Sequence, residues 1–201
     1  MVFTGNPGTG KTMMARMMAR IYRSLDILSK GQLVEVDRSG LVAGYVGQTA
    51  LKTQKVIEKA KGGVLFIDEA YALNGKSEND FGQEAIDTIL KAMEDHRDDL
   101  VVIVAGYTDL MEKFIHSNPG LESRFNRFLL FEDYSPDEML AIFRMQCKKG
   151  CYQLAEGTEE LVRDYINEEN GDPETFGNAR GVRNCFEHIL VAQNNRLAAM
   201  E

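Results

Sequence analysis

The sequence has little cysteine, and this limits both its chemistry and its setting. Its 201 residues include three cysteines, Cys147, Cys151 and Cys185, which are too few and too scattered for a disulfide framework. Cys147 and Cys151 lie four residues apart, but no histidine or third cysteine stands near them, so we interpret them as unbridged helix cysteines and not as metal ligands. We therefore expect a reducing, cytoplasmic setting.

Long apolar runs are absent as well. A membrane-spanning helix takes about 20 consecutive apolar residues. The longest apolar runs here, residues 64–67 and 100–105, have the length of buried strands. The start of the chain has no secretory signal pattern, because a glycine-rich loop follows Met1 almost at once. We expect no membrane partner.

Positive charge is in deficit. The chain has 23 lysines and arginines against 31 aspartates and glutamates, which gives a net charge of −8 with neutral histidines. General nucleic-acid binders usually carry a basic excess or a basic stripe. No run of lysines and arginines interleaved with aromatic residues occurs, so the charge balance disfavours a nucleic-acid partner.

Proline is scarce, at four residues, and the chain alternates between strand and helix patterns. Short apolar segments predict strands at residues 1–5, 33–37, 64–68, 100–105 and 128–131. Helical patterns predict helices at residues 11–23, 49–61, 81–97 and 109–116. A polar loop is predicted at residues 74–80 and a helix break at residues 118–120. The alternation predicts an α/β fold, with a parallel sheet flanked by helices.

The pattern changes after Tyr134. Residues 135–138 read as a helix start, with Ser135 as N-cap, Pro136 in the first turn and acidic residues next. From there the sequence predicts only helices, at residues 136–148, 158–169 and 178–199. We predict two domains, an α/β core at residues 1–134 and a small all-helical domain at residues 135–201. Because the chain opens on the strand that leads into the glycine loop, we expect a missing segment upstream.

The glycine loop matches the P-loop pattern GxxxxGK[ST] in full. Its glycines let backbone N–H groups point at phosphate oxygens, and the helix that follows adds its positive N-terminal end. Lys11 is expected to contact the β and γ phosphates of ATP, and Thr12 to bind Mg²⁺. The predicted nucleotide-binding residues of this segment are Asn6, Pro7, Gly8, Thr9, Gly10, Lys11, Thr12 and Met13.

An acidic pair, Asp68 and Glu69, ends the apolar strand pattern of residues 64–67. Ligands in open α/β sheets bind at the carboxyl ends of the strands. We predict that Asp68 holds Mg²⁺, directly or through its water, and that Glu69 orients and deprotonates the attacking water. With Lys11, these residues favour ATP hydrolysis over a nucleotide switch.

Together these motifs resemble the AAA+ superfamily, and within it the family of the red-type Rubisco activase and stage V sporulation protein K. The matching stretches extend from Met1 to about residue 199 and read VFTGNPGTGKT, LVEVDRSGLVAGYVGQTALKT, GGVLFIDEAYAL, DFGQEAIDTILKAMEDHRDDLVVIVAGY, SNPGLESRF and FGNARGVRNCFE. The resemblance implies a P-loop core followed by a helical lid. It further implies a homo-oligomeric ring, a hexamer, that uses ATP and Mg²⁺ to remodel a protein substrate.

The resemblance also implies residue roles outside the two motifs. Tyr45, Val46 and Gly47 are similar to the pore loop that grips a polypeptide in the central channel. Arg124 is similar to the arginine finger that reaches the γ-phosphate held by a neighbouring subunit, with Arg127 as the alternative.

The resemblance assigns two more roles near the nucleotide. Arg180 is similar to the sensor 2 arginine, which contacts phosphate in its own subunit, and Arg183 is the alternative. The sensor 1 position departs from the common superfamily pattern, because Tyr107 or Thr108 stands where most relatives outside this family have asparagine or threonine.

Two other functions compete with the remodeller. One is a nucleotide-dependent scaffold or regulator with little turnover, which Asp68, Glu69 and Arg124 disfavour. The other is a DNA-directed AAA+ motor, which Tyr45 and the acidic balance disfavour.

Methionine is frequent, with ten residues, and four of them follow the glycine loop at positions 13, 14, 17 and 18. The helix predicted there packs on the sheet, so we interpret these methionines as core filler.

Overall fold

The computed structural model describes residues 1–45, 47–75 and 80–199. These residues form two compact units, one of residues 1–5 and 10–131, the other of residues 6–9 and 132 onward. No helix of the described residues is both long enough and apolar enough to span a membrane.

The first unit is built on a five-stranded parallel sheet in the order β2-β3-β4-β1-β5. The strands are β1 (Val2–Thr4), β2 (Leu33–Val36), β3 (Val64–Ile67), β4 (Val101–Gly106) and β5 (Phe128–Leu130). Strands β1 and β3 are buried along their whole length. The predicted α/β fold is confirmed, and because the strands are parallel, their carboxyl ends meet at one edge of the sheet.

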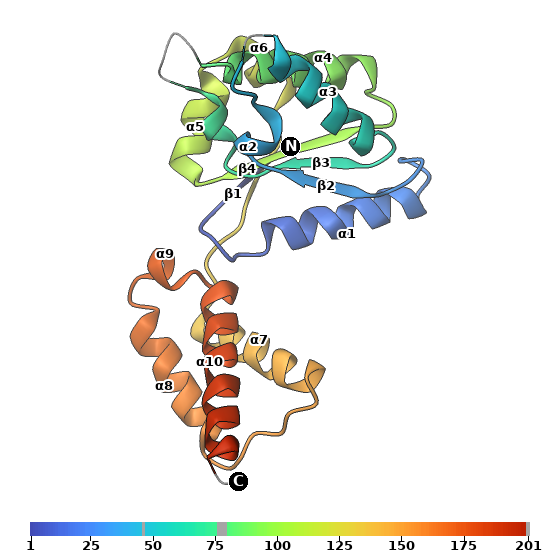
Figure 1. The fold of residues 1–201 in the computed structure, drawn as a ribbon. Helices are drawn as coiled ribbons and strands as arrows, with labels where there is room; N and C mark the ends of the chain where they lie inside the picture. Colours follow the sequence, from blue (N-terminus) through green and yellow to red (C-terminus); the bar gives the residue numbers. More distant parts are fainter. Residues whose placement is uncertain (46, 76–79, 200–201) are drawn as a thin grey trace. The chain divides into compact units, whose positions relative to one another are not determined.

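Helices cover both faces of this sheet (Figure 1). Helix α1 (Lys11–Ser24) lies on one face, where Ala15 and Ala19 pack with Phe3 and Phe66. The other face carries α3 (Gln48–Ala60), α4 (Gly82–Asp95), α5 (Thr108–His116) and α6 (Pro119–Arg124). The alternating strand side chains separate into these two clusters, as the two-residue period of a strand requires.

The interpretation of the α1 methionines as core filler is wrong for three of the four. Met13 is 63% exposed and Met17 50% exposed, and Met14 is exposed too. The small side chains of Ala15 and Ala19 are the fully buried contacts of this helix with the sheet. Because a helix buries only one stripe, the methionines a residue or two away lie on its outer side.

The sequence patterns did not predict three short elements of this unit. They are α2 (Arg38–Leu41), the 3₁₀ helix η1 (Ala70–Leu73) and α6. Asp37 caps α2 by accepting the Gly40 N–H at 3.1 Å, and the hydrogen bond from Ser39 lowers the pKa of this carboxyl. Asn118 caps α6 by accepting the Gly120 N–H at 2.8 Å. The predicted break at residues 118–120 is therefore also a helix start.

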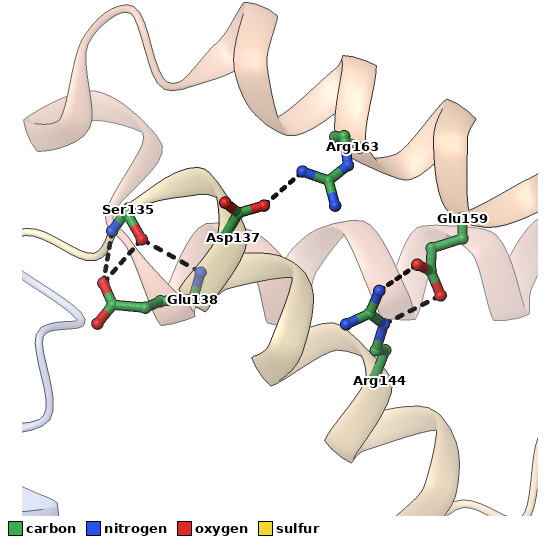
Figure 2. Close-up of polar contacts among 6 residues, drawn as sticks. All are labelled: Ser135, Asp137, Glu138, Arg144, Glu159 and Arg163. Carbon is green, nitrogen blue, oxygen red and sulfur yellow. Dashed lines mark hydrogen bonds and ion pairs between the residues drawn. The ribbon is translucent and has the colours of Figure 1, made fainter.

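The second unit is all-helical in its described part, as predicted. It contains α7 (Pro136–Lys149), α8 (Thr158–Glu169), α9 (Pro173–Phe176) and α10 (Ala179–Ala198). Its core joins α7, α8 and α10 through Met139, Leu140, Phe143, Cys147, Val162, Ile166 and Val182. Ser135 and Glu138 form the capping box that starts α7 (Figure 2).

Two ion pairs join α7 to α8 (Figure 2): Asp137 with Arg163, and Arg144 with Glu159. The hydrogen bond from Arg144 lowers the pKa of Glu159. All four side chains are largely exposed to solvent, where ion pairs contribute little to stability. The apolar core therefore accounts for most of the stability of this unit.

If the apolar core stabilises the second unit, substitutions within one aromatic cluster should lower the free energy of unfolding by unequal amounts. Phe143 is 1% exposed and makes an edge-to-face contact with Phe186, which Tyr152 also contacts while being 44% exposed. Phe143→Ala should lower the free energy of unfolding by about 3–5 kcal/mol, and Tyr152→Ala by about 1 kcal/mol. Urea unfolding followed by circular dichroism measures both, and equal losses would contradict the assigned core.

Candidate functional site

The glycine loop connects β1 to α1 at the carboxyl edge of the sheet. Gly8 and Gly10 have φ of 75° and 94°, which L-residues with a Cβ rarely adopt. Helix α1 begins at Lys11, and its first hydrogen bond runs from Met14 N–H to Gly10 C=O. The first N–H groups of an α-helix precede its i→i−4 hydrogen bonds and lie at its positive end, which is the arrangement that binds anions.

Lys11 and Thr12 occupy the first turn of α1. The Lys11 ammonium donates to the Gly5 carbonyl at 2.7 Å, so this side chain folds back over the loop. The Thr12 hydroxyl donates to a Glu35 carboxylate oxygen at 3.3 Å. Glu35, on β2, is a polar neighbour of Thr12 that the motif analysis did not identify.

The acidic pair follows β3 at the same edge of the sheet. Asp68 is half-buried, and one of its carboxylate oxygens accepts the Glu69 N–H at 3.1 Å. Glu69 is exposed and has a φ of 48°, in the left-handed region that non-glycine residues rarely occupy. Such backbone strain is concentrated at functional sites.

Gly106 and Tyr71 pack closely beside this acidic pair. A Cβ built on Gly106 would lie 2.7 Å from Tyr71 Cε1, so only glycine allows the approach. Burial, and after it the Glu69 carboxylate, raises the pKa of Tyr71 to about 12. The two sensor 1 candidates come directly after Gly106. Tyr107 stands at the N-cap position of α5, Thr108 is the first residue of this helix, and both are half-buried.

Residues 6–9 of the glycine loop belong to the second unit, where Asn178 organises their contacts. Asn178 is fully buried, with a φ of 53°. Its amide nitrogen donates to the Pro7 carbonyl at 3.3 Å and to Asp133 at 2.8 Å, and its amide oxygen accepts the Tyr134 N–H at 2.8 Å. Asp133 also accepts two hydrogen bonds from Asn6.

Two further hydrogen bonds complete this network. Ala179 N–H donates to the Gly8 carbonyl at 3.2 Å, and the Tyr134 hydroxyl donates to the Thr9 carbonyl at 3.2 Å. Sequence reasoning missed Asn178, Asp133 and Tyr134, because hydrogen bonds between distant segments leave no local pattern.

Arg180 and its alternative, Arg183, lie on the first turns of α10, and both are exposed. A Cβ built on Gly8 would lie 3.0 Å from the Arg180 nitrogen. The backbone of Arg180 is thus next to the glycine loop, which sets it apart from Arg183.

Arg124 is the last residue of α6. One of its guanidinium nitrogens lies 3.1 Å from the Glu94 carboxylate, and the other donates to the Ser123 hydroxyl at 3.4 Å. The alternative, Arg127, is exposed between α6 and β5, and its carbonyl accepts the Val2 N–H. Arg124 is therefore held on the first unit by contacts of its side chain, and Arg127 by a hydrogen bond of its backbone.

The predicted pore loop follows α2. Tyr45 is 73% exposed. Gly47, with a φ of 75°, is the N-cap residue of α3, and a Cβ built on it would meet none of the described atoms beyond its chain neighbours within 4 Å. Val46, the third residue of the prediction, lies outside the described residues. The exposed aromatic ring is available for contact with another molecule.

The predicted residues thus fall into groups. Lys11, Thr12, Asp68 and Glu69 all follow strands at the carboxyl edge of the first unit. Residues 6–9 and Arg180 belong to the second unit. In the part of the chain that the structure describes, no three histidine, cysteine or acidic side chains cluster closely enough to hold a metal ion.

Comparison with known protein families gives two matches. The family model "ATPase family associated with various cellular activities (AAA)" matches residues 1–133, and the model of the AAA lid domain matches residues 135–201. Together the matches extend over nearly the whole chain.

The curated relatives include three proteins of different organisms. The chloroplastic ribulose bisphosphate carboxylase/oxygenase activase of Cyanidioschyzon merolae is 47% identical, over 99% of this chain and 68% of the relative. Protein CbbX of Cereibacter sphaeroides is 48% identical, over 98% of this chain and 64% of the relative. Stage V sporulation protein K of Bacillus subtilis is 44% identical, over 98% of this chain and 62% of the relative. The chain thus spans about two thirds of the length of these relatives.

The fold is similar to solved AAA structures. The AAA domain of FIGL-1 in complex with ADP matches with a TM-score of 0.57 at 20% identity, covering 81% of this chain and 53% of that one. At this identity the likeness extends to the fold alone.

The loop geometry predicts that Gly8 tolerates no side chain. A Cβ there would lie 2.0 Å from the Gly177 carbonyl oxygen, whereas at Gly157, with nearly the same φ of 77°, it would meet nothing within 4 Å. Gly8→Ala should weaken ADP binding at least about tenfold, because both strain and displacement of the loop oppose it. Gly157→Ala carries the strain alone and should leave the affinity unchanged. Isothermal titration calorimetry measures both, and a normal affinity for Gly8→Ala would contradict the described loop.

Proposed function

Because the chain belongs to the AAA family of ATPases, we propose that it is the ATP-hydrolysing module of a ring-forming protein remodeller. The observation that carries this proposal is the joint position of the glycine loop and the acidic pair at the carboxyl ends of parallel strands. The relatives at 44–48% identity support it along nearly the whole chain. We divide the module functionally into a core at residues 1–134 and a lid at residues 135–201.

In this proposal the glycine loop and the start of α1 bind the phosphates of ATP. The ammonium of Lys11 moves from the Gly5 carbonyl, where a neutral acceptor holds it, to the more strongly attracting phosphate oxygens. Arg180 adds a second cation beside Gly8. The contacting residues are Asn6, Pro7, Gly8, Thr9, Gly10, Lys11, Thr12, Met13 and Arg180.

The oxygen donors near the loop fit a magnesium ion. Thr12 and Asp68 supply hydroxyl and carboxylate oxygens, the hard ligands that Mg²⁺ prefers, and Glu35 lies within 3.3 Å of the Thr12 hydroxyl. So few protein ligands match an ion that binds mainly through phosphates and water. When bound, Mg²⁺ neutralises charge on the phosphates.

Hydrolysis needs a base near the γ-phosphate, and we assign this role to Glu69. Glu69 follows β3 with a strained backbone, and its side chain is exposed and so accessible to a water molecule. The Asp68 carboxylate fixes the Glu69 N–H and thereby the orientation of the peptide between them. Tyr71 stays protonated at neutral pH and can donate a hydrogen bond beside the carboxylates.

We assign Arg124 to the active site of a neighbouring copy of the chain. Its present partner, Glu94, is 64% exposed. An ion pair of this kind contributes little free energy, so the guanidinium can exchange it for a phosphate. This role requires a homo-oligomer, which we propose to be a hexameric ring.

The exposed Tyr45 supports a protein substrate. An aromatic ring on a glycine-flanked loop offers apolar contact without a requirement for one sequence. One relative is named for the carboxylase that it activates and another for sporulation. We therefore propose a polypeptide as the substrate class.

We propose a cytoplasmic setting for the chain. The cysteines Cys147, Cys151 and Cys185 are free, as thiols are in a reducing compartment.

The assigned base predicts a separation of binding from turnover. Glu69→Gln should lower ATP turnover at least about hundredfold, because a general base contributes 10²–10⁴ in rate, and should leave ADP affinity within about twofold. Glu168→Gln, an exposed glutamate on α8, serves as the control and should change neither. Phosphate release and calorimetry measure the two quantities. Turnover in Glu69→Gln equal to that of the parent would show that this residue has no catalytic role, and a turnover close to zero in both would favour the scaffold.

The assigned arginine predicts complementation between two inactive variants. Arg124→Ala and Glu69→Gln should each turn over ATP slowly. In a mixed ring, some sites combine an intact Glu69 of one subunit with an intact Arg124 of its neighbour, so mixing should restore turnover. Turnover that depends on protein concentration would accompany this. Unrestored turnover, or loss in Arg127→Ala with normal Arg124→Ala, would overturn the assignment.

A further inference from the structure

Arg38 bridges two segments of the first unit that are far apart in the sequence. One guanidinium nitrogen donates to the Ala72 carbonyl in η1 at 2.7 Å, and the other contacts an Asp80 carboxylate oxygen at 2.8 Å. The guanidinium is about one third exposed and the Asp80 carboxylate 15% exposed. A planar fork that satisfies two acceptors at once is a geometry that arginine supplies and lysine does not.

The Asp80 end of this bridge is fixed to the start of α4. The same Asp80 oxygen accepts the Gly82 N–H at 2.7 Å. A Cβ on Gly82 would lie 1.9 Å from the Leu73 carbonyl oxygen and 3.0 Å from Arg38 Nη1. Only glycine at this position therefore allows Arg38, Leu73 and Asp80 to pack together as they do. Burial acts to raise the pKa of Asp80, but the hydrogen bonds from Arg38 and Gly82 outweigh it and lower the pKa.

A continuous series of hydrogen bonds passes through Arg38. The Glu69 carbonyl accepts the Ala72 N–H at 2.8 Å, and the Ala72 carbonyl accepts the Arg38 side chain. The Arg38 carbonyl then accepts the Val42 N–H at 2.9 Å. The series links the backbone of the proposed catalytic base to the residue three positions before Tyr45.

The segment between Arg38 and Tyr45 is held as one piece against α3. The Thr53 hydroxyl, fully buried, donates to the Leu41 carbonyl at 3.1 Å. Lys52 donates to the carbonyls of Ser39 and Val42, at 2.6 and 2.9 Å. These bonds tie α2 and Val42 to one another through α3, so we expect a displacement of α2 to be passed on along the segment toward Tyr45.

We propose that Arg38 is a positioning residue that couples the backbone beside Glu69 to the Tyr45 loop. Nucleotide bound at Asp68 and Glu69 shifts η1, Arg38 transmits the shift to α2, and α2 moves the exposed ring of Tyr45. The inference rests on the proposed function, because it takes nucleotide as the signal and the Tyr45 loop as the responding element.

The chain contains no tryptophan, so Tyr45→Trp provides a single fluorescent reporter on the loop. In this background the emission is recorded with and without magnesium and either ADP or a non-hydrolysable ATP analogue. Calorimetry with the same nucleotides measures affinity separately. The test variants are Arg38→Gln, which removes the fork, and Asp80→Asn, which keeps an acceptor for the Gly82 N–H but removes the ion pair. The control is Arg97→Gln, because this exposed arginine makes a long ion pair, of 3.9 Å, with the adjacent Asp98.

In the parent reporter, we expect each nucleotide to change the emission. In Arg38→Gln and Asp80→Asn, the change should fall to less than about one third, with nucleotide affinity within about threefold of the parent. Arg97→Gln should respond fully. Arg38→Lys, which keeps the charge but not the fork, should recover part of the response at most. A purely structural role would lower the unfolding midpoint and leave the response per bound nucleotide intact.

The remaining outcomes separate the inference from the proposed function. A full response in folded Arg38→Gln and Asp80→Asn would overturn the coupling. Nucleotide that binds to the parent without changing the emission would overturn it too, and would leave the ATPase proposal standing. A parent that binds no nucleotide would contradict both.

Discussion

The parallel direction of the strands is the constraint on which the rest of this structure depends. Parallel pairing of β2, β3, β4 and β1 brings the segments that follow them to one edge of the sheet. Gly5 at the end of β1, the acidic pair and the sensor 1 candidates are therefore neighbours in the first unit, although about one hundred residues separate the first from the last. Each strand positions a few residues of the candidate site, and the pairing of the strands sets the distances between these residues.

Glycine and strained backbone recur where this edge is most crowded. Gly106 allows Tyr71 to approach the end of β4, and Gly82 leaves room for the Leu73 carbonyl and the Arg38 guanidinium. Glu69 at this edge adopts a positive φ without being glycine, and so, within the second unit, does Asn178. Such conformations cost roughly 1–3 kcal/mol each and persist only where the surroundings hold them. At Asn178 the surroundings are three hydrogen bonds of a fully buried amide.

The sequence was sufficient to predict the sheet, the long helices and the lid, because their signals are local. Apolar runs of four to six residues and helical spacing over more than ten residues repeat within a short window. Three of the four α1 methionines were assigned to the core wrongly, because composition alone does not identify which stripe of a helix is buried. The short helices α2, α6 and α9 depend on single capping side chains, Asp37, Asn118 and Asp172. The contacts of Arg38 with Asp80 and of Asn178 with Pro7 could not be predicted. The paired residues lie 42 and 171 positions apart, and such pairs leave no periodic pattern in the sequence.

Strand β5 has a consequence for the behaviour of the chain in solution. It pairs only with β1 among the described residues, and Phe128, Leu129 and Leu130 are all exposed along it. An apolar strand with an open edge is a template for the growth of aggregates. Mutual repulsion through the net charge of −8 opposes this association at neutral pH. That protection vanishes near the isoelectric point of about 5.0, so mild acid is the condition under which the isolated chain precipitates most readily.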